Sequence, residues 1–547
     1  MLARRCTRRQ FVRQGGAGLT AGAVAAGLAG LSRRAVAAPA QAVTPESVAA
    51  AVTSLDGVIQ EALDKTRVPG LAVAVVHQDA VVHLSGHGVR EAGTGDPVDP
   101  DTVFQLASLS KPLAATVVAA VVGDGVVDWD ARIGDLTPDF TLFDPLASRE
   151  VALRDMFCHR SGLPHHGGDD LEDLGYDRAA ILHRLRYLRP ASSFRSTYAY
   201  TNFGLTAAAV AASAAAGLAW EDLAAERLYA PLGMTRTSSR FDDFIAAANR
   251  ARGHVLVDGT YVAKYQRQPD AQSPAGGVSS TARDLAEWLR LQLGGGTVDG
   301  RGIVAAAALG ETHRPHMSTN RPEHPDTERT GFYGLGWNVS YDAQGRVRLS
   351  HSGAFALGAG TAAYLVPADQ LGIAVLTNAA PIGLAEAVAL SFLDLAESGA
   401  VAYDYLGILG PIVAEELAPS YGTAVDYGRQ PAAAAPPLAL DAYAGAYAND
   451  YFGEIAVGAD RGGLVLHLGP ARTAYPMRHY DRDVFLYQPV GENAGGESAV
   501  SFAIGADGRA TGVTIENLDR NLQGGFTRAA PTIPGAAGAS ATPPTRT

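Results

Sequence analysis

The sequence predicts an α+β fold followed by a small all-β domain, and three observations support this. Strand-like runs lie at both ends of the region between about residues 50 and 415, while Ala- and Leu-rich helical stretches fill its middle. Such an order is not the regular alternation of a parallel α/β protein. Short strands and turns follow closely from residue 438 onward. The length of 547 residues also exceeds that of one ordinary domain.

The elements of the first region follow from local signals. Thr44 followed by Pro45 predicts the start of a helix that continues to about residue 66. The apolar run 71–76 predicts a buried strand, and 80–84 predicts its partner. Strands return late in the region, so a sheet built from both of its ends is expected; these later strands are predicted at 333–339, 347–350, 360–366 and 371–377.

Composition also sets the domain boundaries. We predict a first domain at 38–415, a linker at 416–437 that ends in an Ala- and Pro-rich run, and a β-rich domain at 438–530. The close spacing of short strands in the β-rich domain predicts an antiparallel sandwich or barrel, and no catalytic constellation is apparent there. The tail 531–547 is rich in Pro, Ala, Gly, Ser and Thr and is expected to be disordered.

The first 37 residues have the features of an export signal. Arg8 and Arg9 lie in a Thr-Arg-Arg-Gln-Phe-Val-Arg run that resembles a twin-arginine motif, and a Gly- and Ala-rich apolar stretch follows. The sequence at 35–37, Ala-Val-Ala, suits cleavage. We therefore expect a periplasmic or extracellular protein, the alternative being a disordered basic tail. No later apolar run reaches about 18 residues, so no membrane span is expected in the mature chain.

Charge and motifs exclude several classes of partner. The net charge is −12, and the first 37 residues contain seven Arg and no acidic residue, so the rest of the chain is more acidic still. An acidic body argues against nucleic acid as a partner. No Walker or Rossmann fingerprint occurs, and no cofactor is expected. The predicted partner is a small-molecule or peptide substrate, while the oligomeric state stays open.

Ser108 and Lys111 form the first chemical motif. The chain contains only three lysines against 41 arginines, and one of them closes an S-x-x-K run before a buried helical stretch. An amine can lose its proton when desolvated, whereas a guanidinium cannot. On a helix this spacing places both side chains on one face. A hydroxyl beside a deprotonatable amine is an activated nucleophile, although the same pair can also stand on a solvated helix end.

Tyr200 and Asn202 form a second motif. Their two-residue spacing places both side chains on one side of an extended or tightly turning segment. A phenol near a cationic amine is expected to ionise below its usual pKa. The Asn202 amide can orient Lys111 or a substrate carbonyl. The alternative is an aromatic-rich core strand.

His351, Gly353 and Ala354 lie between predicted strands. A histidine there can titrate near neutral pH and bind an anionic or polar end of a substrate. Gly353 allows a ligand to approach the backbone closely. The Ala354 N–H, together with that of Ser108, can serve as an oxyanion donor. The alternative for His351 is a structural role within a strand.

Two further pairs have weaker chemical meaning. Cys158 and His159 are adjacent, and adjacent residues on a helix do not face each other, so a Cys/His nucleophilic pair is not favoured. His165 and His166 raise a weak possibility of metal binding, but no metal site is predicted. With the first 37 residues removed, Cys158 is the only cysteine left and no disulfide can form.

Together the three motifs resemble the serine β-lactamase and penicillin-binding-protein superfamily. The branch concerned contains class C β-lactamases, DD-carboxypeptidases, D-aminopeptidases and esterases. The resemblance covers about residues 50–400 and implies an antiparallel sheet with helices, a helical domain, and a nucleophile between them. The S-x-x-K, Y-x-N and H-x-G motifs occur in the family's order as Ser108 and Lys111, Tyr200 and Asn202, and His351 and Gly353. The β-rich segment is more loosely similar to an accessory domain of such hydrolases.

The resemblance implies an exported serine hydrolase that works through an acyl-enzyme. Ser108 is the expected nucleophile, and Lys111 and Tyr200 share the acid–base work in an order left open. D-amino-acid-containing peptides or esters are the favoured substrates. His351 stands where typical β-lactamases have lysine, which argues against efficient β-lactam hydrolysis. The alternatives are a weak β-lactamase and a non-catalytic penicillin-binding sensor or scaffold.

Overall fold

A computed structural model describes residues 43–322, 329–342, 344–460 and 462–529, and it divides into two units. The first unit runs to Thr423 and also includes the segment Val490–Gly496, and the second holds the remaining C-terminal residues. The predicted export signal at 1–37 and the predicted tail at 531–547 lie outside the described residues.

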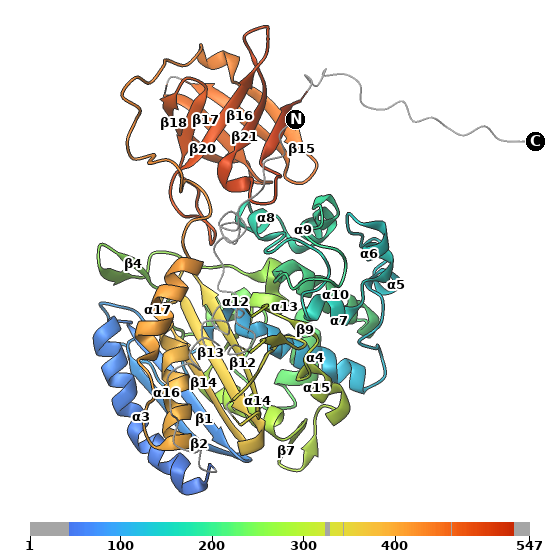
Figure 1. The fold of residues 1–547 in the computed structure, drawn as a ribbon, viewed down its shortest axis with the longest axis vertical. Coiled ribbons are helices and arrows are strands. Elements are labelled where there is room, and N and C mark those ends of the chain that lie inside the picture. The colour runs from blue at the N-terminus through green and yellow to red at the C-terminus, as the bar shows by residue number, and fades with distance from the viewer. Residues whose placement is uncertain (1–42, 323–328, 343, 461, 530–547) are drawn as a thin grey trace, which may run out of the picture. The chain divides into compact units, whose positions relative to one another are not determined.

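An eight-stranded antiparallel sheet forms the centre of the first unit, which confirms the α+β prediction (Figure 1). Strands from the start of the region pair directly with strands from its end, as the sequence indicated. In spatial order they are β2 (Ala80–Gly88), β1 (Gly70–His77), β14 (Leu371–Thr377), β13 (Ala359–Val366), β12 (Val347–Phe355), β11 (Asn338–Tyr341), β10 (Phe332–Tyr333) and β9 (Met317–Ser318).

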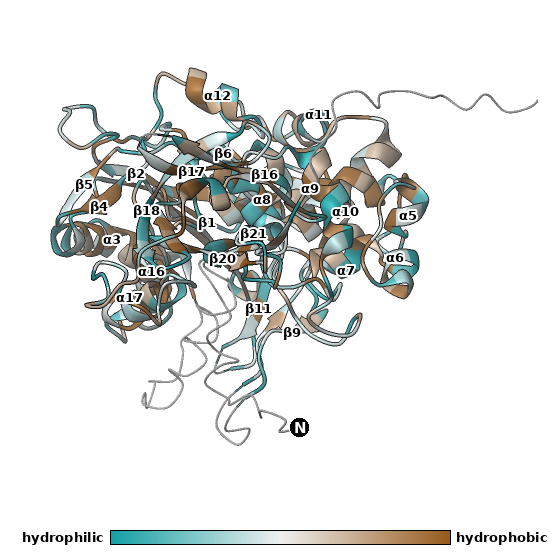
Figure 2. Cartoon of the chain, turned by 90° about the horizontal axis from the view of Figure 1, so that it is seen from above, coloured by the Kyte–Doolittle hydropathy of each residue, from teal (hydrophilic) through white to brown (hydrophobic). Residues whose placement is uncertain are grey.

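Helices cover both faces of this sheet. On one face α3 (Pro45–Thr66), α16 (Leu384–Ser398) and α17 (Tyr405–Glu416) share an apolar core with β1, β13 and β14. The opposite face packs against α14 (Ala282–Leu293). Figure 2 shows hydrophilic and hydrophobic residues on different sides of the peripheral helices, as expected where one side of a helix packs inward.

The start of α3 follows from its capping residues. The Thr44 side chain accepts a hydrogen bond from the Ser47 backbone N–H at 3.2 Å, and the Ser47 side chain accepts one from the Thr44 backbone N–H at 3.0 Å. This reciprocal capping satisfies two backbone donors that the first helical turn leaves without partners. The predicted helix start at Thr44 and Pro45 is confirmed.

One predicted strand is wrong in its extent. The run 333–339 is divided between β10 and β11 by a turn in which Gly336 has a φ of 81°. A Cβ at Gly336 would lie only 2.8 Å from the Lys111 carbonyl oxygen. Glycine is therefore needed both for the left-handed turn and for the close approach to the Lys111 backbone.

A helical region lies beside the sheet (Figure 1), and two of its helices carry residues of the chemical motifs. It includes α4 (Ser110–Gly123), α7 (Leu153–Phe157) and α10 (Asn202–Ala216), and α10 packs against the other two. Most residues of α4 and α10 are buried. Among the described residues no single helix is long and apolar enough to cross a membrane, although α10 together with the bent continuation at Trp220–Tyr229 passes that test by length and composition.

The second unit is a closed antiparallel barrel, so the prediction of a sandwich or barrel resolves to a barrel. Neighbouring strands pair antiparallel, and the last strand closes on the first through Tyr447 and Ala448. Its interior includes Tyr443, Phe485 and Phe502, whose rings contact one another. The strands are β15 (Gly445–Asn449), β16 (Gly453–Asp460), β17 (Gly463–Leu468), β18 (Thr473–Asp481), β19 (Val484–Tyr487), β20 (Ser498–Ile504), β21 (Ala510–Ile515) and β22 (Gly525–Arg528).

Candidate active site

Ser108 lies in the short turn η2 (Ala107–Leu109) immediately before α4. Ala107 has a φ of 48°, a left-handed conformation that alanine adopts rarely and that tends to occur at functional sites. The Ser110 hydroxyl stabilises this turn because it donates to the Ala107 carbonyl at 2.6 Å and accepts from the Val278 N–H at 3.0 Å. Ser110 is therefore a buried clamp for the turn that carries Ser108.

Lys111 is fully buried beside Ser108 at the start of α4. Its Nζ lies 3.0 Å from Ser108 Oγ, 2.7 Å from Asn202 Oδ1 and 2.9 Å from the Ala275 carbonyl oxygen. Burial lowers the pKa of Lys111 to about 7, while the charge of Asp169 acts in the opposite direction. A substantial fraction of Lys111 is thus neutral near pH 7 and able to accept the Ser108 proton.

Tyr200 is buried next to this pair, with Lys111 Nζ 4.5 Å from the centre of its ring. The expectation of a lowered phenol pKa is wrong. Burial raises the pKa of Tyr200 far above its ordinary value, and the nearby Ser108 hydroxyl only partly opposes this effect. Tyr200 therefore remains a neutral phenol, which can donate a proton but does not act as a resident phenolate base.

Asn202 is the first residue of α10, and its amide connects two charged side chains. Its Oδ1 accepts from Lys111, and its Nδ2 donates to Asp169 Oδ2 at 2.9 Å. Of the two roles that the sequence left open for this amide, the structure shows the contact with Lys111. The two residues are 91 positions apart in the chain.

His351 does not have the properties that the sequence suggested. It is fully buried on β12, where Nε2 pairs with the Tyr333 hydroxyl at 2.8 Å and Nδ1 with the Ser352 carbonyl at 2.7 Å. The expected titration near neutral pH is wrong, because burial and the nearby Lys111 lower the pKa of His351 to about 3. The imidazole is neutral, with both nitrogens engaged by the protein, and this arrangement does not favour the expected binding of a substrate anion.

Gly353 permits a close approach, but the group that approaches it in the structure is the protein's own backbone. A Cβ at this position would lie 2.1 Å from the Leu106 carbonyl oxygen and 3.0 Å from the Leu109 N–H nitrogen. Leu106 precedes the turn that holds Ser108 and Leu109 is its last residue, so β12 packs directly against that turn. Ala354 follows at the end of β12, opposite Gly360 of β13.

Gly353→Ala is expected to destabilise the protein by about 1–3 kcal/mol, because the new methyl group meets fixed backbone. It should also lower activity, since relief of the clash moves the Ser108 turn away from β12. Urea unfolding and esterase assays measure both effects. Gly302→Ala is the matched control, because nothing lies within 4 Å of a Cβ there. Equal stability and equal activity of the two variants would contradict this explanation of Gly353.

Sequence reasoning missed two groups around the site. The first is Asp169, which contacts Asn202 and also pairs with His166 at 2.7 Å. The second is the segment Val490–Gly496, assigned from sequence to the β-rich domain but grouped with the first unit. Its Glu492 carboxylate accepts from the Ala356 N–H at 2.5 Å, directly after β12. Neither group belongs to a recognised motif, and the contacts that bring them to the site, with Asn202 and with Ala356, join distant parts of the chain.

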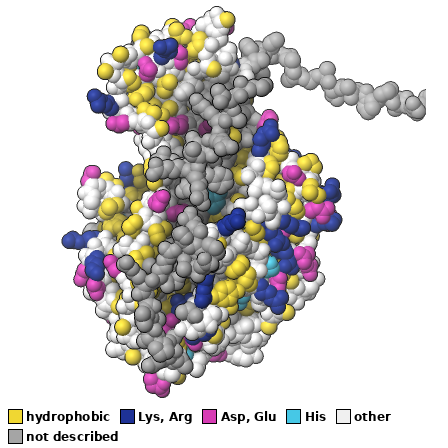
Figure 3. Space-filling view, viewed as in Figure 1, with side chains coloured by type: hydrophobic (Ala, Val, Ile, Leu, Met, Phe, Trp, Pro, Cys, Tyr) yellow, Lys and Arg dark blue, Asp and Glu magenta, His cyan; other side chains and the backbone are white. Residues whose placement is uncertain are grey.

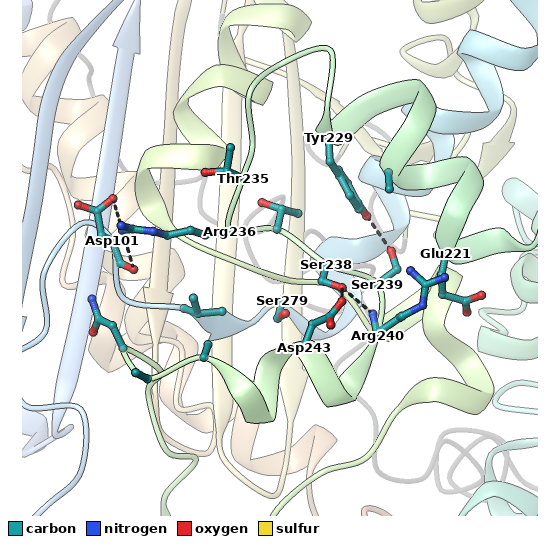
Figure 4. A pocket seen from close by; sticks show the side chains of 16 residues that line it. Asp101, Glu221, Tyr229, Thr235, Arg236, Ser238, Ser239, Arg240, Asp243 and Ser279 are labelled. Atoms are coloured by element: carbon teal, nitrogen blue, oxygen red, sulfur yellow. Dashed lines mark hydrogen bonds and ion pairs between the residues drawn. The ribbon is translucent and has the colours of Figure 1, made fainter.

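A separate cavity of about 470 Å³ lies elsewhere in the first unit (Figure 4). Its lining includes the polar side chains of Asp101, Tyr229, Arg236 and Asp243, but not Ser108, Lys111 or Tyr200. Several of these groups already pair with one another, such as Arg236 with Asp101 at 2.7 Å.

Charged residues of both signs are interspersed over the visible surface of the first unit (Figure 3). Within the described ranges no group of three or more His, Cys, Asp or Glu side chains is placed to hold a metal ion.

Comparison with known proteins identifies the family. The model of the Beta-lactamase family matches residues 55–394, which include all three motifs. The chain belongs to the Beta-lactamase family. A second family, described as a domain of unknown function (DUF3471), matches residues 429–528.

Curated relatives of this family member include hydrolases and a penicillin-binding protein. Unguisins hydrolase ungD' of Aspergillus campestris is 27% identical, over 59% of this chain and 60% of its own length. Penicillin-binding protein 4 of Amycolatopsis lactamdurans is also 27% identical, over 58% of this chain and 84% of its own. Esterase EstB of Burkholderia gladioli is 32% identical over a shorter stretch, 24% of this chain and 34% of its own. The chain is thus a hydrolase of the β-lactamase fold.

Solved structures share the fold of this family member. The octameric penicillin-binding protein homologue from Pyrococcus abyssi has a TM-score of 0.56 at 19% identity, and the match covers 85% of this chain and 98% of that one. A class C β-lactamase from Rhodobacter sphaeroides has a TM-score of 0.51 at 23% identity, over 63% of this chain and 98% of that one. These matches confirm the predicted β-lactamase/transpeptidase-like fold.

Proposed function

We propose that this protein is an exported serine hydrolase that cleaves amides or esters through an acyl-enzyme on Ser108. The observation that carries the proposal is the 3.0 Å contact between Ser108 Oγ and Lys111 Nζ. Burial lowers the Lys111 pKa to about 7, so that amine is available as a base under ordinary conditions.

The proposed reaction uses the geometry as follows. Neutral Lys111 takes the proton of Ser108 as Oγ forms a bond to the substrate carbonyl carbon. The N–H groups of Ser108 and Ala354 stabilise the oxyanion of the tetrahedral intermediate. The neutral phenol of Tyr200 protonates the leaving amine or alcohol as its bond to carbon breaks, and Lys111 returns a proton to the phenol. Water then hydrolyses the acyl-enzyme by the reverse proton transfers.

D-amino-acid-containing peptides and esters are the proposed substrates, with β-lactams as poor ones. Membership of the family supports acyl transfer, and relatives named as a hydrolase, an esterase and a penicillin-binding protein support this range of substrates. A panel of a D-Ala-D-Ala peptide, a D-amino-acid amide, nitrocefin and p-nitrophenyl esters tests it, with Ser108→Ala as the background. Turnover of nitrocefin above all others would overturn the substrate proposal. Absence of turnover together with stable penicillin labelling would favour a non-catalytic sensor.

Export is proposed from the twin-arginine motif. Changing Arg8 and Arg9 to lysine is expected to retain the precursor in the cytoplasm, because a receptor reads this signal. Cell fractionation with immunoblotting, in a host with a twin-arginine pathway, measures precursor and processed chain. Processing of the double-lysine variant at the normal rate would point to the general secretory route instead.

A further inference from the structure

A buried chain of polar side chains extends from Lys111 to residues outside the three motifs. Lys111 Nζ contacts Asn202 Oδ1 at 2.7 Å, and Asn202 Nδ2 contacts Asp169 Oδ2 at 2.9 Å. His166 Nδ1 reaches the same carboxylate oxygen at 2.7 Å. All four side chains are buried. Asp169 begins the short helix α8 (Asp169–Asp173), so this chain connects α4, α10 and α8.

The Asp169 carboxylate determines which way the Asn202 amide faces. An ionised carboxylate only accepts hydrogen bonds, so the amide must present its NH₂ group to Asp169. The carbonyl oxygen of the amide then faces Lys111. The flipped amide would place its oxygen against the carboxylate and its NH₂ group against the Lys111 amine. The contact between the two oxygens is repulsive in either state of Lys111, the contact between the NH₂ group and the amine is repulsive when Lys111 is charged, and both are costly in a buried site.

His166 holds Asp169 in place and also contacts the backbone of the Tyr200 segment. Its ring donates to Asp169, and its backbone N–H donates to the Tyr200 carbonyl at 2.9 Å. His166 has a φ of 57°, a conformation that asparagine tolerates better than most other non-glycine residues. A single residue therefore fixes both the carboxylate behind Asn202 and the segment that carries Tyr200.

Asp169 is also the charged group that faces Lys111. Its charge raises the pKa of Lys111 and thereby opposes the effect of burial. Three other titratable groups near Lys111 are neutral, since burial lowers the pKa of His159 and of His351 and raises the pKa of Tyr200. Removal of the Asp169 charge should therefore make the Lys111 ammonium easier to deprotonate.

We propose that Asp169, held by His166, is a positioning residue that fixes the Asn202 amide toward Lys111 and sets the pH at which Lys111 becomes a base. This inference rests on the proposed function, because it assumes that Lys111 accepts the Ser108 proton. It assigns a role to His166, for which the sequence suggested only a weak possibility of metal binding.

The test is the pH dependence of kcat/KM for a p-nitrophenyl ester in Asp169→Asn. The wild type should lose activity as pH falls through the Lys111 pKa, near 7. Asp169→Asn should lower the plateau about tenfold to a hundredfold, as expected when the hydrogen bonds from Asn202 and His166 lose their charged acceptor. Its acid limb should also move to lower pH by about one pH unit or more. Asp170→Asn makes the same charge change in the same helix and should leave the limb in place.

A lower plateau with an unmoved acid limb, or a limb moved equally by Asp170→Asn, would show a merely structural role and overturn the proposal. His166→Asn and His166→Ala add a second comparison. The asparagine amide can replace the Nδ1–H donor and should recover most of the activity that alanine loses. Equal loss in both variants would remove His166 from the proposal. Fluorophosphonate labelling of the wild type distinguishes failure of this inference from failure of the proposed function. An unlabelled Ser108 would refute the proposed function itself.

Discussion

Ser108→Ala is expected to abolish covalent labelling and to lower kcat/KM by at least about a thousandfold, as for other nucleophile replacements. The remaining site can still bind substrate and polarise its carbonyl, so a small residual rate above water is expected. The variant should fold normally, because removal of one hydroxyl leaves the η2 turn and its Ser110 clamp intact. Fluorophosphonate labelling followed by peptide mapping, together with ester hydrolysis rates, measures the effect.

Ser110→Ala is the informative comparison for this variant. It removes the clamp between the Ala107 carbonyl and the Val278 N–H and should lower stability, yet the label should still appear on Ser108. A label on Ser110 in the wild type, or ester hydrolysis by Ser108→Ala at the wild-type rate, would contradict the assignment of the nucleophile.

Lys111→Arg is expected to lower the acylation rate by about 10²- to 10⁴-fold, close to the loss in Lys111→Met. Arginine keeps the positive charge but does not release its proton in a protein. Lysine at this position has its pKa lowered to about 7 by burial and can therefore act as the base. Stopped-flow acylation by p-nitrophenyl acetate measures the effect, with thermal unfolding to separate it from destabilisation.

The same pair of variants distinguishes a base from a fixed charge. If Lys111 acts only through its charge, Lys111→Arg stays active while Lys111→Met does not. If Lys111 is the base, both lose activity together, and neither retains the acid limb near pH 7 that the wild type should show. An active Lys111→Arg enzyme would contradict the account. The proton of Ser108 would then have no acceptor among the proposed catalytic residues, because Tyr200 is held as a neutral phenol.

Local sequence features predicted the elements and contacts that form between neighbours in the chain. The pairing of Ser108 with Lys111 follows from helical spacing, and the start of α3 follows from its capping residues. The contact between Lys111 and Asn202 joins residues 91 positions apart, and the sequence indicated it only as one of two roles open to the Asn202 amide.

The features that sequence reasoning missed depend on burial and on long-range packing. His351 looked titratable, but Tyr333 from β10, two strands away in the same sheet, occupies its Nε2. Tyr200 appeared to gain acidity from Lys111, yet burial has the larger effect on its pKa. Asp169 and Glu492 carry no motif, and their proximity to Asn202 and to the end of β12 exists only in the folded chain.

Rapid-quench mass spectrometry of the wild-type enzyme mixed with p-nitrophenyl acetate tests the central claim most directly. The account predicts a burst of p-nitrophenol that matches the enzyme concentration, and an acetyl adduct on the peptide that contains Ser108. The adduct should appear during the burst and decay at the rate of turnover, and Ser108→Ala should show neither burst nor adduct. Steady turnover that depends on Ser108 but shows no adduct, under conditions in which deacylation is rate-limiting, would contradict the acyl-enzyme. So would an adduct on another residue that forms and decays at the catalytic rate.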